Sequence, residues 1–182
     1  MAPRTALPYT PEDADPATLP TPGLRRRFAA MLYEGVVLFG VLMVSGLLFS
    51  TLTDQRHALQ GRLELQGFLF AVLGLYFAWF WVHGGQTVAM KTWHVRVVRL
   101  DGRPLGWRGA LARYALSWMW FLPALGVAGA LNLHSSGEYA LALLAGMAAY
   151  AILTRLLPDR QFLHDRLCET RLVTWRPAPR RR

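Results

Sequence analysis

Glu34 is a candidate for chemistry because of where it lies. It is the only charged residue in the long apolar stretch from Phe28 to Thr53. A carboxylate at membrane depth costs a few kcal/mol, so it is usually paired, protonated or exposed to water. The residue therefore indicates either a titrating or cation-binding site, or a structural salt bridge or hydrogen bond to a neighbouring helix. The residue types alone leave both interpretations open.

A second acid, Asp165, follows the last apolar stretch and lies between His164 and Arg166. One hypothesis makes it an ion or proton site at the mouth of a helical bundle. The other makes it a helix cap, or the partner of Arg27, that fixes the helix ends. Arg27 lies seven residues before Glu34 on the same helical face, but about 10 Å away along the axis, so the two could meet only if Arg27 reaches inward.

The sequence "HGGQTVAMK" indicates a sharp turn followed by a short helix. Gly85 permits the turn, and Gln86 or Thr87 could cap the helix that follows. A phosphate-cradling loop is the alternative, but the full GxxxxGK[ST] pattern of nucleotide-binding loops is missing.

Metal and enzyme chemistry find little support in the sequence. Three histidines, His83, His94 and His164, could supply nitrogens near the two acids, yet their spacing matches no zinc or iron motif. No Ser-His-Asp, paired-carboxylate or HExxH arrangement is present. We therefore predict no catalytic residues, no metal and no cofactor, with a membrane enzyme as a third alternative.

The composition predicts the helices that position the candidate residues. Of 182 residues, 53% are apolar and only 17% are charged, against roughly 25% charged in an average soluble domain. The apolar residues gather in runs long enough to cross a bilayer core, which takes about 20 residues. We predict an all-α polytopic membrane protein with four transmembrane helices, at about residues 29–51, 64–82, 111–131 and 139–157.

The basic residues predict the orientation of these helices. Lys and Arg number 20 against 11 Asp and Glu, a formal net charge of +9. Most of them fall in the N-terminal segment, the 83–113 loop and the C-terminal segment, whereas the 132–138 loop has none. By the positive-inside rule both termini are cytoplasmic. The charge then suits anionic lipid headgroups of the bilayer, and we expect no nucleic-acid partner.

The remaining segments complete the predicted domain organisation. Residues 1–23 hold six of the eleven prolines and are predicted to be a disordered cytoplasmic tail, and residues 176–182 form a basic cytoplasmic tail. The membrane domain covers residues 24–175. Within it, two strand-like segments at about 93–100 and 170–175 are predicted to pair in a small cytoplasmic sheet, with a turn at Asp101-Gly102.

Taken together, three ordered motifs resemble the RDD family of small bacterial membrane proteins, in the form seen in proteobacterial members. They are "RRRFAAMLYEG", "GGQTVAMKTWHVRVV" and "LHDRLCETRLV". The resemblance implies that Arg27 is the Arg of the family, that Glu34 takes the place of its first Asp, and that Asp165 is its second Asp. It also implies an inner-membrane location and suggests transport, with cation–proton antiport linked to some members.

Two hypotheses about function follow. In the first, the protein is a small transporter or exchanger that uses Glu34 to move a monovalent cation or a proton, and assembly as a homo-oligomer would help to form the pathway. In the second, it is a non-transporting membrane scaffold or regulatory module in which Arg27, Glu34 and Asp165 form a structural clamp. The discriminating feature is whether Glu34 faces a hydrated cavity or a sealed contact between helices.

Overall fold

The computed structural model describes residues 14–15, 18–53, 61–101, 103–157 and 160–176. The predictions for most of the N-terminal tail, for residues 177–182 and for Gly102 of the predicted turn lie outside these residues. The chain is mostly helical. Its described elements, in order, are α1 (Leu24–Leu52), α2 (Arg62–Gly84), α3 (Val88–Thr92), β1 (Val95–Arg99), α4 (Trp107–Ser117), the 3-10 helix η2 (Trp118–Trp120), α5 (Leu122–Ala130), α6 (Ser136–Leu156), α7 (Leu163–Leu167) and β2 (Thr170–Thr174).

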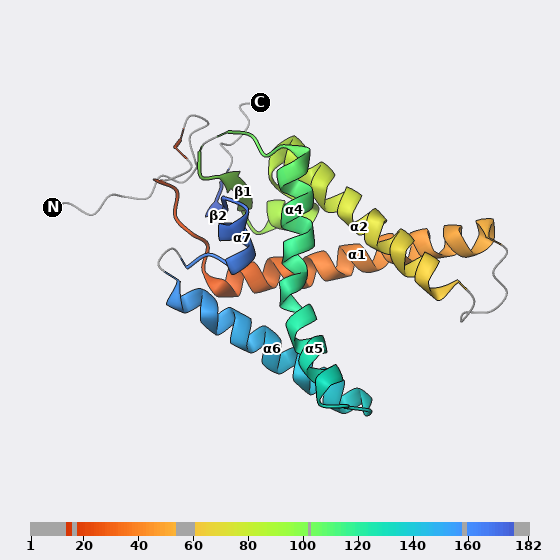
Figure 1. Cartoon of the computed structure of the whole chain (residues 1–182). Coiled ribbons are helices and arrows are strands. Elements are labelled where there is room, and N and C mark those ends of the chain that lie inside the picture. The colour runs from red at the N-terminus through yellow and green to blue at the C-terminus, as the bar shows by residue number, and fades with distance from the viewer. Residues whose placement is uncertain (1–13, 16–17, 54–60, 102, 158–159, 177–182) are drawn as a thin grey trace.

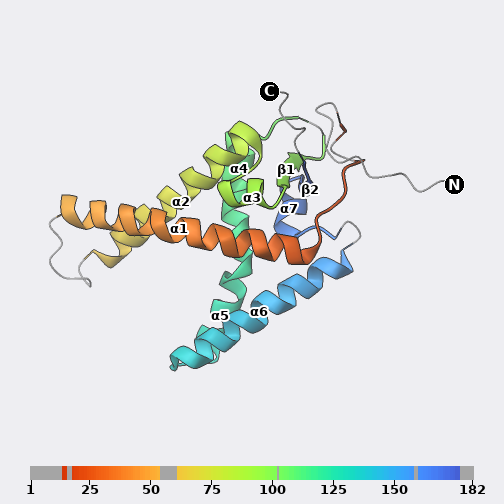
Figure 2. The same ribbon diagram turned by 180° about the vertical axis from the view of Figure 1, so that it is seen from behind.

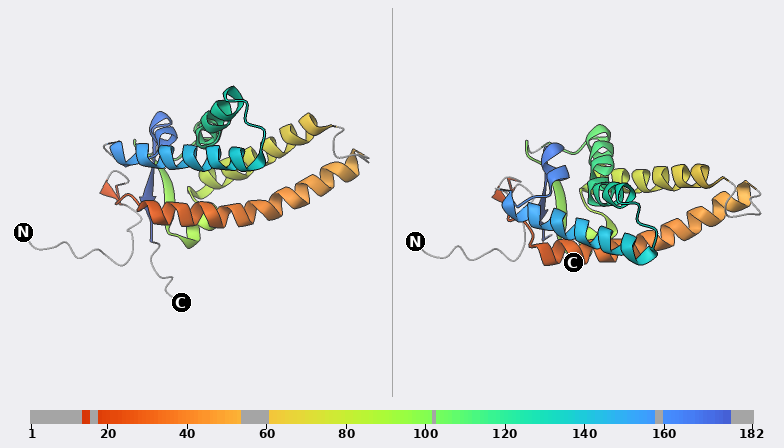
Figure 3. Two further views of the ribbon diagram at one scale, coloured as in Figure 1. Left: turned by 90° about the horizontal axis from the view of Figure 1, so that it is seen from below. Right: turned by 60° about the horizontal axis from the view of Figure 1, so that its bottom comes forward.

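The helices form two hairpins that diverge from a common end (Figure 1). One hairpin is α1 with α2, and the other is α5 with α6. At the end from which they diverge lie the two strands together with α3 and α7 (Figure 2). From below, the same two hairpins extend away from the sheet in one general direction (Figure 3).

Three of the predicted spans are continuous helices. The helices α1, α2 and α6 have 29, 23 and 21 residues and are long and apolar enough to cross a membrane. At 1.5 Å per residue each exceeds the hydrocarbon core of about 30 Å. Helix α6 begins with a capping box, in which Ser135 caps the helix and Glu138 bonds back to the chain before it.

The third predicted span, 111–131, is not one helix, which corrects that prediction. Helix α4 ends at Ser117, one 3-10 turn follows, and α5 begins at Leu122 with only nine residues. Pro123 lies in the first turn of α5. Its ring nitrogen donates no hydrogen bond and its ring would collide with the preceding helical turn, so the chain breaks there.

The burial pattern of α1 is the reverse of that in a soluble protein. The buried residues of this helix are Arg27, Ala30 and Glu34, which share one face at spacings of three and four. Large apolar side chains point outward instead, with Leu32 77% and Leu47 69% exposed. Water would penalise such a surface, whereas lipid would not. The outer surface of α1 is therefore suited to contact with lipid.

The predicted pairing of the two distant strands is confirmed. β1 and β2 form an antiparallel two-stranded sheet in which Val95 faces Thr174 and Val97 faces Leu172. Val95, Val97 and Leu172 are buried in the hydrophobic core. The sheet joins the middle of the chain to its C-terminal part.

Residues 18–23, which the sequence assigns to the disordered tail, contact this sheet. The backbone N–H of Thr174 donates to the carbonyl of Pro20 at 2.8 Å, and Arg171 donates to the carbonyl of Leu19. The segment just before α1 therefore packs against the sheet.

Candidate functional site

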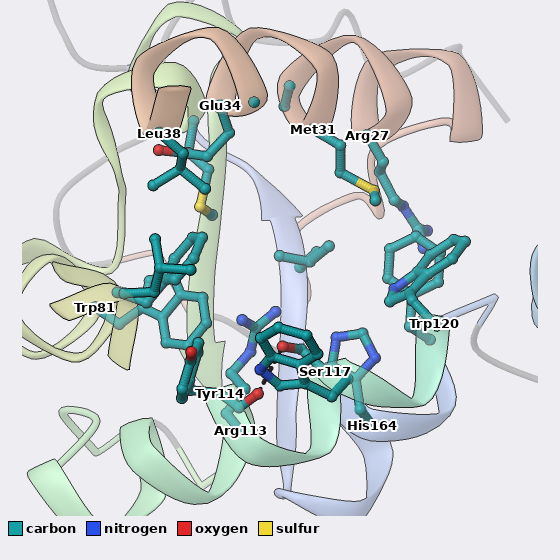
Figure 4. A pocket seen from close by; sticks show the side chains of 18 of the residues that line it. Arg27, Met31, Glu34, Leu38, Trp81, Arg113, Tyr114, Ser117, Trp120 and His164 are labelled. Atoms are coloured by element: carbon teal, nitrogen blue, oxygen red, sulfur yellow. Dashed lines mark hydrogen bonds between the residues drawn. The ribbon is translucent and has the colours of Figure 1, made fainter. Parts of the chain in front are cut away.

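A cavity of about 370 Å³, which we call the central cavity, lies where the two hairpins meet the sheet. Arg27, Met31 and Glu34 of α1 line one side (Figure 4). Arg113 and Tyr114 of α4 line the opposite side, with the residues around η2. The walls are mainly apolar, so the few polar groups that reach the cavity decide its chemistry.

Glu34 is buried against two neighbouring helices. The hydroxyl of Tyr76 on α2 donates to Oε1 at 2.6 Å, and the hydroxyl of Thr87, next to α3, donates to Oε2. No cation forms a salt bridge with this carboxylate among the described residues. It is also the only acid among the described residues that line the cavity. Its two oxygens are therefore bound by neutral donors alone.

Asp165 is completely buried and pairs with Arg113. Nη2 of Arg113 lies 2.6 Å from Oδ1 of Asp165, and both side chains are almost inaccessible to solvent. The guanidinium of Arg113 also lies over the ring of Trp81, 4.2 Å from its centroid. The partner of Asp165 is thus Arg113 of α4, rather than Arg27 as one of our hypotheses had it.

Arg27 binds backbone carbonyls instead of an acid. Its Nε donates to the carbonyl of Pro22 at 2.8 Å, and its Nη2 donates to the carbonyl of Arg160 at 2.7 Å. The guanidinium lies over the ring of Phe162. Arg27 therefore ties the start of α1 to the segment between α6 and α7.

His164 lies beside the Arg113–Asp165 pair. Its Nε2 is 3.4 Å from Oδ1 of Asp165, and its Nδ1 is 2.9 Å from the hydroxyl of Tyr150. Burial lowers the pKa of His164 to about 4 against the opposing effect of Asp165, and the charge of Arg113 also lowers this pKa. The imidazole is neutral at pH 7.

The loop after α2 connects Glu34 to the sheet. Gly85 ends α2 with φ of 70° and accepts a hydrogen bond from Val97 of β1. Gln86 donates to the carbonyl of Val95 at 2.8 Å. Thr87 is the N-cap of α3 and donates to Glu34. These residues position β1 and Glu34.

The three charged residues that the sequence singled out, all of them described in the structure, are not joined to one another by hydrogen bonds or ion pairs. Arg27 and Glu34 line the same cavity, but each has its own partners. Sequence reasoning counted Arg113 with the basic loop residues, and it did not single out Tyr76. The one available signal for Arg113 was its place inside the predicted 111–131 span, since an ionisable residue there usually has a partner.

Among the described residues, no three His, Cys, Asp or Glu side chains gather closely enough to hold a metal ion.

Long apolar helices, buried charges and an apolar exterior define a membrane-type helical protein. The chain belongs to the RDD family, whose family model matches residues 21–169. The matched range runs from the segment before α1 to the residue before β2, and includes Arg27, Glu34, Arg113 and Asp165. No match was found among curated proteins or among solved structures.

Proposed function

We propose that the protein is a small transporter of the cytoplasmic membrane that exchanges a monovalent cation and a proton at Glu34. The observation that carries this proposal is the environment of Glu34. Glu34 is one of the residues that line the central cavity, and its carboxylate accepts hydrogen bonds from Tyr76 and Thr87 without a basic partner among the described residues.

Glu34 would bind a proton or a cation because no basic side chain among the described residues balances its charge. An ionised carboxylate removed from water is costly unless a cation balances it. A proton or a small cation at Glu34 supplies that balance, and the two compete for the same oxygens. The hydroxyl oxygens of Tyr76 and Thr87 add neutral ligands of the type that hard cations prefer.

The interrupted third helix supports the same function. Ser117, Trp118 and Phe121, at the junction of α4, η2 and α5, line the central cavity. Broken helices occur within membranes where the freed backbone groups are buried in protein or face a cavity, and transporters use them to build binding sites. We propose that α4, η2 and α5 together form the fourth crossing.

The proposed topology places the sheet and both termini in the cytoplasm. The turn between α5 and α6, residues 131–135, carries no Lys or Arg, whereas Arg96, Arg99, Arg103 and Arg108 lie at the sheet end. This asymmetry follows the positive-inside rule. Because four helices enclose little space, we further propose that the protein works as a homo-oligomer.

Ion flux in proteoliposomes tests the exchange. The purified full-length protein is reconstituted with a pH-sensitive dye inside, and sodium or potassium is added outside. We expect cation-driven proton movement in the wild type and its loss, by at least about tenfold, in E34Q. The matched control is E64Q, which neutralises an exposed acid at the start of α2. Undiminished flux in a folded E34Q protein would contradict the role of Glu34.

A second function is favoured by the other two family residues. Arg27 binds the carbonyls of Pro22 and Arg160, and Asp165 binds Arg113, so both residues are already used in contacts that tie α1 to the segment after α6 and α4 to α7. This arrangement suits a non-transporting membrane module whose charged residues form a structural clamp and whose sheet binds a partner. Absence of flux with every cation, together with a lowered melting temperature of E34Q, would favour this module over the transporter.

A further inference from the structure

A second pocket, of about 540 Å³, lies between the beginning of α1 and the end of α6. We call it the arginine pocket. The two helices diverge from this end of the molecule (Figures 1 and 2). It lies at the same end of both hairpins as the sheet.

The charges that line the arginine pocket are all of one sign. The polar and charged side chains among its described lining residues are Thr21, Arg25, Arg27, Thr154, Arg155 and Arg160. None of the described lining residues is acidic. The side chains of Arg25, Arg155 and Arg160 are exposed and form no ion pair with the described residues. Four cations thus share one pocket without a neutralising acid from those residues.

Arg27 provides the second observation. Its side chain is only 3% exposed, and its Nη1 has no hydrogen-bond partner among the described residues. A buried guanidinium N–H without an acceptor is costly. Arg27 lines both the central cavity and the arginine pocket, so an anion in the arginine pocket would lie near a buried guanidinium that still has a free N–H donor.

The backbone adds to the positive charge. Helix α1 begins at this pocket with Gly23 as its N-cap, no side-chain cap and no acidic residue in its first turn. A long helix carries a partial positive charge at its N-terminus, where free N–H groups point outward. The helix end and the four arginines therefore favour the same kind of ligand.

We propose that the arginine pocket binds a phosphate group, supplied either by the headgroup of an anionic phospholipid or by a soluble phosphate. Arginine suits phosphate because its planar guanidinium donates two parallel hydrogen bonds. A lipid source fits the surroundings, since Leu32 of α1 and Leu156 of α6 expose their side chains near these helix ends. Acyl chains would lie along those outward faces while the headgroup occupies the pocket.

The test compares two variants that remove the same charge. The pocket variant carries R25Q, R155Q and R160Q and keeps Arg27, whose bond to residue 160 uses the backbone carbonyl. The control variant carries R103Q, R108Q and R166Q, three exposed arginines outside the pocket. Each full-length protein is purified in detergent with equal phosphatidylglycerol and phosphatidylcholine, and native mass spectrometry measures the lipid retained. A parallel thermal-shift series compares inorganic phosphate with chloride at equal ionic strength.

We expect the wild type and the control to retain phosphatidylglycerol in preference to phosphatidylcholine. In the pocket variant the ratio of retained phosphatidylglycerol to phosphatidylcholine should fall at least about tenfold. A change of this size corresponds to the loss of one charge-assisted hydrogen bond. Stabilisation by inorganic phosphate in the wild type and control alone, without a lipid preference, would identify a soluble phosphate as the source. Identical behaviour of the pocket and control variants in both assays would overturn the proposal.

If the pocket variant does not fold, R155Q alone carries the same comparison against R166Q alone. Arg155 is an exposed side chain near the end of α6 without a partner among the described residues, so its removal leaves the internal contacts intact. The readout is independent of ion exchange at Glu34, because lipid retention and phosphate stabilisation are measured without a cation gradient.

Discussion

At the scale of single residues, the buried pair of Arg113 and Asp165 holds α4 to α7. D165N should destabilise the protein by about 3–5 kcal/mol, because it leaves the charge of Arg113 buried without a partner. E169Q, which changes an exposed acid four residues away, should have little effect. Thermal unfolding in detergent measures both, and equal melting temperatures would contradict a stabilising role of the pair.

Replacing both partners tests whether the charge itself is needed. The double variant R113M/D165L removes both charges and keeps apolar bulk, and such replacements of buried pairs are often neutral or stabilising. We expect its melting temperature to lie above that of D165N. A double variant less stable than D165N would show that the pair contributes more than the cost of an unpaired charge.

His164 should make stability depend on pH. Its pKa is about 4 in the folded protein, against 6.5 in the absence of burial, so acid favours the unfolded chain, which binds the proton more readily. Above pH 6.5 His164 does not change the free energy of unfolding with pH. As the pH is lowered from 6.5 to 4, this free energy falls by up to about 1.4 kcal/mol per pH unit. Below pH 4 the effect of His164 on the free energy of unfolding no longer changes.

Melting temperatures between pH 4 and pH 8 check this prediction. H164N should flatten the decline in that window, whereas H134N, at an exposed histidine in the turn before α6, should leave it unchanged. Asp165, Arg113 and Tyr150 are the titratable or charged groups beside His164, and all three are kept in both variants. A decline of the same slope in H164N would place the acid sensitivity elsewhere.

At the scale of elements, Gly85 joins α2 to the sheet through a conformation that other residues rarely adopt. A Cβ at this position would lie 2.5 Å from the carbonyl oxygen of Val97, and φ is positive. G85A should cost at least about 1–2 kcal/mol of stability. Its neighbour Gly84 has open space around it, so G84A is a matched control that thermal unfolding should find near the wild type.

The second hairpin depends on close approach of α5 and α6. A Cβ at Gly146 would lie 2.5 Å from Cβ of Ala124, so the missing side chain of Gly146 allows α6 to pack closely on α5. G146A should force the helices apart and cost about 1–3 kcal/mol. G126A, in α5 but with no atom near its added methyl group, should be tolerated, and equal stabilities would disprove the tight contact.

At the scale of the whole molecule, the proposed topology places the α5–α6 turn and the sheet on opposite sides of the membrane. In a C168S background, H134C marks the turn and R108C marks the start of α4. A membrane-impermeant maleimide should label H134C in intact spheroplasts and R108C only after permeabilisation. Labelling in the reverse order would show that the protein has the opposite orientation in the membrane. Labelling of both cysteines before permeabilisation would contradict the proposed topology.

The sequence alone determined the membrane character, the helices α1, α2 and α6 to within a few residues, the strand pairing and the family. The helices and the positions of the strands follow from local signals, because hydropathy over some 20 residues and a strand-like pattern need no knowledge of distant contacts. Glu34 and Asp165 were recognisable for the same reason, as acids in or beside apolar stretches. The strand pairing was inferred from the similar strand-like character of the two segments.

Only the tertiary structure decided which groups surround those acids. The partners of Glu34 lie 42 and 53 residues away in the chain, and Arg113 lies 52 residues from Asp165. Such contacts depend on how helices rotate and cross, which hydropathy does not specify. The interruption at η2 has a similar origin, since Pro123 permits a kink but the packing of Trp120 on Tyr150 and Phe162 places the break against the cavity.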